Sequence, residues 1–159
     1  MQHKIISLID RQRAVITAED FWAGASYRTK LDPLSEADAF HRPVPGMHTV
    51  AELLSHVVAW RRDCMHKIVG DRPHPLKVDS LEDWTPNELL RQRGWDTLKQ
   101  EFYDSADALC ALLMDRDDAF LEGRPDGEER SFQFILDGLV DHDIHHLGQV
   151  AMVISQLRR

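Results

Sequence analysis

Histidine is the residue type whose number and spacing stand out in this 159-residue sequence. There are nine histidines, and three of them, His142, His145 and His146, fall within five residues. Neutral imidazole nitrogens bind divalent zinc, nickel, copper and iron. Two histidines four residues apart lie on the same face of a helix, one turn from each other, so both rings can reach one metal ion. The cluster therefore raises the hypothesis of a metal centre.

The direction in which each histidine points follows from the helical rotation of about 100° per residue. On the C-terminal apolar pattern, His142 and His146 fall at the edge of the apolar stripe, whereas His145 falls outside it. His56 falls at the shoulder of the stripe on an earlier helical pattern. These positions predict that His56, His142 and His146 face the interior and that His145 does not.

Three imidazole ligands would leave at least one coordination position of a divalent ion open, which is typical of catalytic rather than structural sites. Such an ion lowers the pKa of a bound water toward ~7, and the water can be displaced by a thiol or oxygen of a substrate. The alternative interpretation is that these histidines are ordinary boundary residues whose rings are only hydrogen-bonded. The coincidence of three inward-facing rings favours the metal centre.

Two charged residues fall inside apolar stripes, where an unpaired charge would be costly. Asp143 and Arg61 fall inside the stripes of their respective helices, and we predict an ion pair between them. The second interpretation places Asp143 beside a metal-bound imidazole. The run from His142 to His146 also approaches the H-E-x-x-H motif of zinc peptidases, with Asp143 as general base. We disfavour that alternative because the carboxylate is one methylene short and no third ligand follows.

Other residues near His56 on its helix have two interpretations each. Asp63, two turns after His56, either orients that histidine or lies on a solvated flank. Trp60 and Met47 either line a pocket beside the metal or belong to the core. The sequence does not separate these alternatives.

Helices must position these residues, because the apolar spacing is helical and strand-like alternation is scarce. The expected helices span approximately 4–27, 49–70, 85–113 and 131 to nearly the end. Capping boxes that begin at Thr49 and Thr85 mark the starts of the second and third helices. Each helix is apolar on one side, so the predicted fold is an all-α four-helix bundle with a long crossover between helices 2 and 3.

The composition restricts the compartment and the partners. Lys and Arg number 19 against 27 Asp and Glu, a net charge of −8, which disfavours binding to nucleic acids and to anionic membranes. The N-terminus has no secretion signal, and no stretch approaches the ~18 apolar residues of a membrane span. Cys64 and Cys110 are isolated, as expected of buried thiols in a reducing compartment. We expect one cytoplasmic domain over residues 1–159.

Two segments together resemble the DinB/YfiT-like family. Residues 43–60 read PVPGMHTVAELLSHVVAW, a proline–glycine loop followed by a capped helix that carries one histidine. Residues 142–150 read HDIHHLGQV, a late H-x-x-x-H that runs into a Gly-Gln pair. The resemblance covers most of the chain in order and spacing.

The resemblance implies a four-helix bundle with a three-histidine divalent metal site near one end, often in a homodimer. Carried over, His56, His142 and His146 are the ligands, and zinc or nickel is the expected ion. Related enzymes include metal-dependent transferases and isomerases that use low-molecular-weight thiols such as bacillithiol or mycothiol. Leu147 stands where an arginine often precedes the Gly-Gln pair, a change expected to alter the surroundings of the ion.

Two functional hypotheses of different class follow. The first is a metal-dependent enzyme, a thiol-dependent S-transferase or small hydrolase, in which a water or thiolate at the open metal position attacks a small-molecule substrate. The second is a non-catalytic metal- or ligand-binding bundle of a stress response. Activity toward electrophiles, measured with and without a thiol, separates them.

Overall fold

The computed structural model describes residues 2–22, 24–71 and 74–158. Within these ranges the chain is all-helical and contains no strand, which confirms the all-α part of the prediction. None of the helices in these ranges is long and apolar enough to cross a membrane. The elements, in chain order, are α1 His3–Thr17, α2 Tyr27–Leu31, α3 Glu36–Ala39, α4 Val50–Val69, α5 Asn87–Arg93, α6 Trp95–Met114, the 3-10 helix η1 Phe120–Glu122, and α7 Phe132–Leu157.

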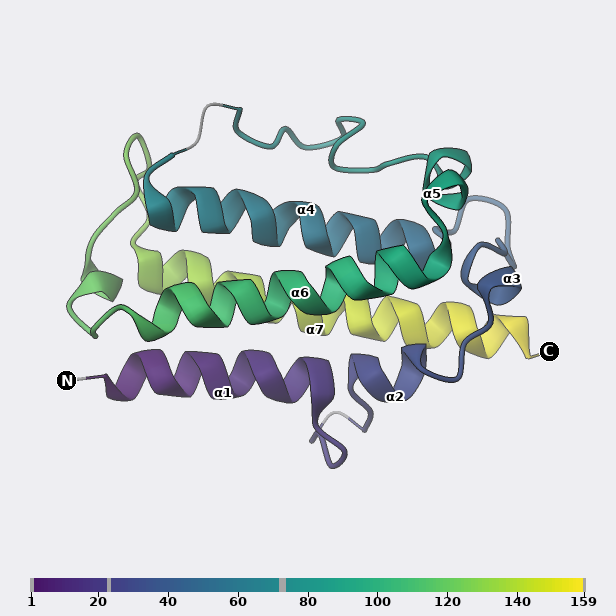
Figure 1. Ribbon diagram of the computed structural model, residues 1–159, viewed down its shortest axis with the longest axis horizontal. Coiled ribbons are helices and arrows are strands. Elements are labelled where there is room, and N and C mark those ends of the chain that lie inside the picture. The colour runs from purple at the N-terminus through teal and green to yellow at the C-terminus, as the bar shows by residue number, and fades with distance from the viewer. Residues whose placement is uncertain (1, 23, 72–73, 159) are drawn as a thin grey trace.

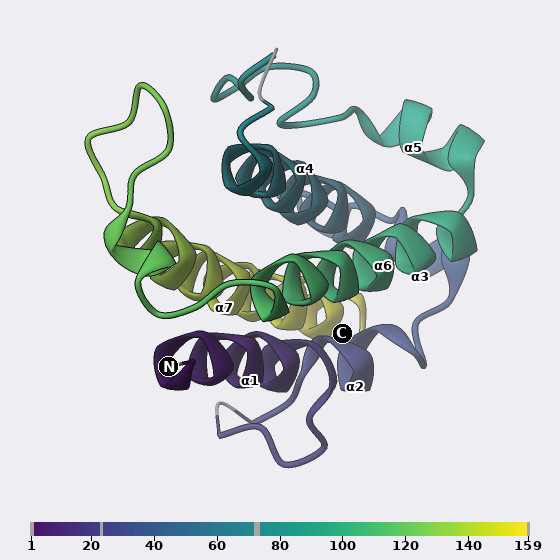
Figure 2. The same ribbon diagram turned by 60° about the vertical axis from the view of Figure 1, so that its left-hand side comes forward.

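The four long helices α1, α4, α6 and α7 lie side by side (Figures 1 and 2). Helix α4 packs against both α6 and α7, and α1 packs against the same two helices. Residues 74–86 run back along α4, so α6 points in the same direction as α4, while α7 points the opposite way (Figure 1). This path places the histidine-bearing faces of α4 and α7 against each other, and it lays residues 74–86, hereafter the link, beside them.

The core consists of two hydrophobic clusters separated by a polar layer. One cluster contains Val57, Phe102 and Val150, and the other contains Ile9, Leu109 and Leu136. Between them each long helix contributes one buried polar residue to the layer, which consists of Gln12, Arg61, Ser105 and Asp143. Buried polar groups are costly unless they are hydrogen-bonded, so this layer requires partners within the bundle.

The helices that carry the histidines begin where the sequence predicts. The Thr49 hydroxyl accepts a hydrogen bond from the Glu52 N–H at 3.1 Å, and the Glu52 carboxylate accepts one from the Thr49 N–H at 2.8 Å. This reciprocal capping box satisfies two backbone donors at the start of α4. Ser131 caps α7 by accepting from the Phe134 N–H. The predicted starts of these two helices are confirmed.

The first predicted helix ends ten residues earlier than expected. Helix α1 stops at Thr17, because Ala18 adopts an extended backbone conformation, and a new helix begins at Tyr27. The break allows the Tyr27 ring to enter the core, where it is fully buried. Its hydroxyl donates to the carbonyl of Asp143 at 3.0 Å and so supports α7 beside the polar layer.

The third predicted helix is divided into α5 and α6, and its expected capping box is absent. The Thr85 hydroxyl donates back to the Leu81 carbonyl, and Pro86 precedes the first helical residue. Gly94 then breaks the helix with φ 83°, a left-handed conformation that residues with a Cβ adopt only at a cost. The turn at Gly94 sends Trp95 into the core, where it is almost completely buried.

Candidate metal centre

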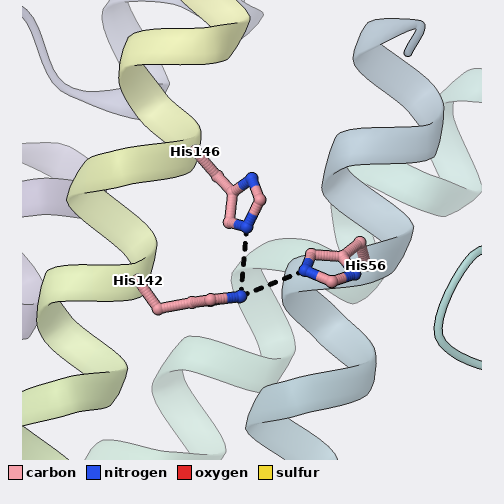
Figure 3. A group of neighbouring side chains, drawn as sticks. All are labelled: His56, His142 and His146. Carbon is pink, nitrogen blue, oxygen red and sulfur yellow. Dashed lines mark hydrogen bonds between the residues drawn. The ribbon is translucent and has the colours of Figure 1, made fainter. Parts of the chain in front are cut away.

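Three histidine rings converge between α4 and α7 (Figure 3). The Nε2 atom of His142 lies 3.1 Å from Nε2 of His56 and 3.0 Å from Nε2 of His146. One ligand nitrogen from each ring lies within 4.8 Å of the others. His56 and His146 are buried, whereas the side chain of His142 is 26% exposed. The structure thus brings together the three histidines that the sequence singled out.

Hydrogen bonds on the far side of two rings determine which nitrogen faces the centre. Nδ1 of His56 lies 2.8 Å from Oδ1 of Asp83, and Nδ1 of His146 lies 2.7 Å from Oε1 of Gln149. Both oxygens are acceptors, so both Nδ1 atoms carry the proton and both Nε2 atoms present a lone pair to the centre. If Nε2 of His142 carries a proton, it can donate that proton to only one of these two lone pairs at a time.

This donor set fits a divalent cation. The three Nε2 atoms are directed at a shared point, and two of the rings are oriented by acceptors behind them, as in carboxylate–histidine–metal arrangements. Burial, reinforced by the nearby His142 ring, lowers the pKa of His146 from 6.5 to about 4. Burial also lowers the pKa of His56, although Asp83 opposes the shift. Both rings are therefore neutral near pH 7, in the form that binds metals.

The link supplies a residue of the centre that sequence reasoning missed. Besides His56, the buried Asp83 carboxylate accepts hydrogen bonds from Nε1 of Trp60 at 2.9 Å and from the Asp79 N–H at 2.8 Å. The next residue, Trp84, stacks on the His56 ring with the two ring centroids 3.9 Å apart. No helical periodicity marks Asp83, because its position depends on the path of the link across α4.

The Gly-Gln pair after the second histidine motif has a visible role. Gln149 lies one turn after His146 and accepts a hydrogen bond from the Nδ1–H of that ring, so it fixes the orientation of the ring. Leu147 is buried in the hydrophobic core. The leucine that stands in place of the common arginine therefore contributes to packing.

The structure also places the third histidine of the 142–146 cluster, His145, and Asp63, for which the sequence allows two interpretations. His145 is exposed, as its position on the helix predicts. Asp63 is buried, so it does not lie on a solvated flank. Its carboxylate accepts a hydrogen bond from the Leu76 N–H at 3.0 Å and lies 3.4 Å from Nζ of Lys67. The contact with Leu76 attaches the link to α4.

The predicted ion pair lies in the polar layer directly beside the histidines. Oδ2 of Asp143 lies 2.7 Å from Nη2 and 3.1 Å from Nε of Arg61, and both side chains are fully buried. Burial opposes ionisation of Asp143, but the charge of Arg61 together with hydrogen bonds from Arg61 and Gln12 outweighs it and lowers the pKa of this carboxyl from 3.8. The remaining Nη1 of Arg61 donates to the Phe102 carbonyl and to Ser105. The ion-pair prediction is confirmed.

Asp143 also approaches the histidine next to it in the chain. Its Oδ1 lies 4.0 Å from Nδ1 of His142. Among the described residues neither of these two buried atoms has a hydrogen-bond partner. Asp143 therefore belongs to the structural ion pair and at the same time lies behind the His142 ring.

Comparison with known proteins identifies a family. A family model described as the DinB superfamily matches residues 22–150, which include all three converging histidines. No curated protein and no solved structure matches the chain.

Proposed function

Because the chain belongs to the DinB superfamily, as its histidine motifs predicted, we propose that it is a divalent-metal-dependent enzyme. His56, His142 and His146 are its metal ligands. The observation that carries the proposal is the convergence of three Nε2 atoms, two of which have their Nδ1 protons engaged behind the ring. A proton on Nε2 of His142 satisfies only one of the other two lone pairs at a time, whereas a cation between the rings would satisfy all three nitrogens.

The protein's own residues orient and shield the reacting position. Asp83 and Gln149 hold two imidazoles in the tautomer that presents Nε2, and Trp84 covers one face of His56. The partial exposure of His142 leaves one side of the centre accessible to a small molecule. When bound, a divalent ion supplies Lewis acidity toward a water or thiol.

A thiol-dependent S-transferase or a small hydrolase is the reaction class that we propose. An all-imidazole set suits zinc or nickel, and three protein ligands leave room for an exchangeable group. The co-substrate in the first case is a low-molecular-weight thiol. We further propose that residues 1–159 act as one four-helix-bundle domain of the DinB type, with the link as its crossover, in a cytoplasmic homodimer.

Metal analysis of three proteins tests the ligand assignment. Protein purified without an affinity tag is expected to hold one divalent ion per chain, and His56→Ala is expected to lose it. His145→Ala is the matched control, because this ring lies next to His146 but is exposed. A His56→Ala protein that binds the metal as tightly as the parent would contradict the three-histidine centre.

A thiol-transfer screen tests the reaction. Electrophiles are offered to the metal-loaded protein with and without a low-molecular-weight thiol, and turnover is expected to require the metal and His142. Hydrolysis without the thiol would favour the hydrolase. Stoichiometric metal with no turnover of either kind would instead indicate a non-catalytic metal-binding bundle.

A further inference from the structure

A cleft of about 180 Å³ lies between α4 and α7, directly beside the histidine centre. Gly138 is one turn before His142 on α7, and Trp60 is one turn after His56 on α4, so both lie on the faces that carry the histidines. His142 itself borders the cleft. The other apolar contributions come from Cys64, Ile135 and Leu139.

The walls of the cleft suit an uncharged group. Burial raises the pKa of Cys64 to about 12, so its thiol stays neutral and acts as an apolar surface. The indole N–H of Trp60 is already donated to Asp83, which leaves the hydrocarbon part of the ring for contacts. Asp63 and Lys67 at the border of the cleft are paired, Lys67 with both Asp63 and Glu128, so each has a counter-charge.

Gly138 borders the cleft and contributes no side chain to it. It lies inside a 26-residue helix, where glycine is less favourable than alanine. Its φ is not among the positive values that favour glycine. A Cβ added there would meet no atom of the described residues within 4 Å. Packing within this chain therefore does not require the glycine, whereas a side chain at 138 would extend into the space next to His142.

We propose that this cleft is a subsite for an uncharged apolar part of the substrate, about the size of a benzene ring, and that Gly138 sets the size it accepts. An apolar cavity of about 150 Å³ accommodates benzene, so the measured volume fits such a group. The inference rests on the proposed function, because the substrate's reacting group would meet the ion beside His142 while its apolar part fills the cleft.

The first experiment needs no metal. Benzyl alcohol is titrated into the metal-free protein, and the methyl NMR signals of Ile135 and Leu139 are followed. We expect saturable shifts in the parent, none in Gly138→Leu, and parent-like shifts in Gly148→Leu, the matched control. Gly148 is also a helical glycine of α7 with open space around its Cβ, but it does not border the cleft. Circular dichroism verifies that both variants are folded.

The second experiment links the cleft to the ion. Benzohydroxamate and acetohydroxamate carry the same metal-binding group and differ in a phenyl against a methyl group. On the zinc-loaded parent we expect benzohydroxamate to bind at least about tenfold more tightly, which is the gain expected from burying a ring of this size. Gly138→Leu is expected to bring the two affinities within about twofold of each other, with acetohydroxamate binding unchanged.

The outcomes separate the two proposals. Absence of benzyl alcohol shifts, or shifts that persist in Gly138→Leu, would overturn the subsite whether or not the protein binds metal. Equal affinity of the zinc-loaded parent for the two hydroxamates would overturn its role in substrate binding while the metal centre stands. Failure to bind zinc with benzyl alcohol shifts intact would reject the proposed function but retain an apolar binding cleft.

Discussion

Two polar clusters join α4 to α7 at neighbouring positions, and they differ in how their charges and lone pairs are satisfied. Arg61 and Asp143 form a fully buried ion pair, in which the fold supplies both the cation and the anion. The adjacent cluster at His142 has three imidazole nitrogens that face one another with no cation from the protein between them. Both clusters lie between the same helices, so their place in the fold alone does not distinguish them.

The difference shows how a binding site can be separated from a structural contact. The guanidinium of Arg61 donates to Asp143, Phe102 and Ser105, so this cluster is nearly complete within the fold. In the histidine cluster, two rings have hydrogen-bond partners behind them, whereas the three Nε2 atoms at the centre face one another. Native structures satisfy nearly all buried polar groups, and three converging ring nitrogens that share one proton leave a position that a cation from outside the chain would fill.

Removing the internal cation is the strongest test of this comparison. Arg61→Met leaves Asp143 buried without its partner, and breaking a buried pair in this way costs about 3–5 kcal/mol. Urea unfolding of the metal-free protein measures the loss. The double variant Arg61→Met/Asp143→Leu is expected to recover much of the stability, because it leaves no uncompensated charge. A single variant as stable as the parent would mean that the ion pair is not a structural element.

Adding zinc is expected to have the next largest effect on the free energy of unfolding. Zinc at about 100 times its Kd should stabilise the parent by about 2.7 kcal/mol, because the ion binds the folded state. His142→Ala should show no such gain at the same zinc concentration. Thermal unfolding with and without zinc measures both. Equal stabilisation of the two proteins would place the ion elsewhere.

Replacing Asp83, the carboxylate that lies behind His56, tests whether the hydrogen bond to Nδ1 orients this ring for metal binding. Asp83→Asn keeps an acceptor near Nδ1 but removes the charge, and loss of such an outer partner typically weakens metal binding about 10- to 100-fold. Competition with a chelator of known affinity measures the change. Glu82→Gln is the control, since the neighbouring side chain is exposed. If the two variants bound zinc equally well, Asp83 would have no role in orienting the ligand.

Lowering the pH is expected to affect the two clusters in different pH ranges. We expect this to be the smallest of the effects on stability. The pKa of His146 is about 4 and that of His56 is also below 6.5, so between these pH values the unfolded chain binds protons that the folded metal-free protein does not. Stability should therefore fall as the pH is lowered from 6.5 toward 4. The pKa of Asp143 is below 3.8, so its contribution is lost only at still lower pH.

Urea unfolding of chelator-treated protein across this pH range measures the decline. We expect it to be smaller than the effect of Arg61→Met, because a protonated ring can move toward the exposed side of the centre at His142. His146→Phe should reduce the pH dependence of the free energy of unfolding between pH 6.5 and 4 and leave it unchanged below pH 3.8. An unchanged profile in this variant would show that the histidines do not titrate as a separate cluster.

Local periodicity explains why the centre itself was predictable. The side on which a helical residue points depends only on its position in the apolar pattern, so the sequence predicts that His56, His142, His146 and the Arg61–Asp143 pair face the interior. The same reasoning placed His145 outside. These predictions hold because both histidine-bearing helices are long, regular and clearly capped.

What periodicity did not predict depends on non-local geometry. Asp83 reaches His56 only because the link crosses α4, and no repeating pattern encodes that path. The break after Thr17 and the break at Gly94 interrupt apolar patterns that continue in the sequence. In both cases the chain leaves the helix so that an aromatic ring farther along, Tyr27 or Trp95, can enter the core.

The distance along the chain between His56 and His142, 86 residues, has a consequence for biosynthesis. When α4 has left the ribosome, only one of the three donors exists, and the other two appear with α7. An ion held by all three can therefore be acquired only after α7 has been made and docked. Once held, it restrains a long loop, as a covalent cross-link would. Loading of the proposed ion would thus be a late step of maturation that follows the docking of α7 against α4.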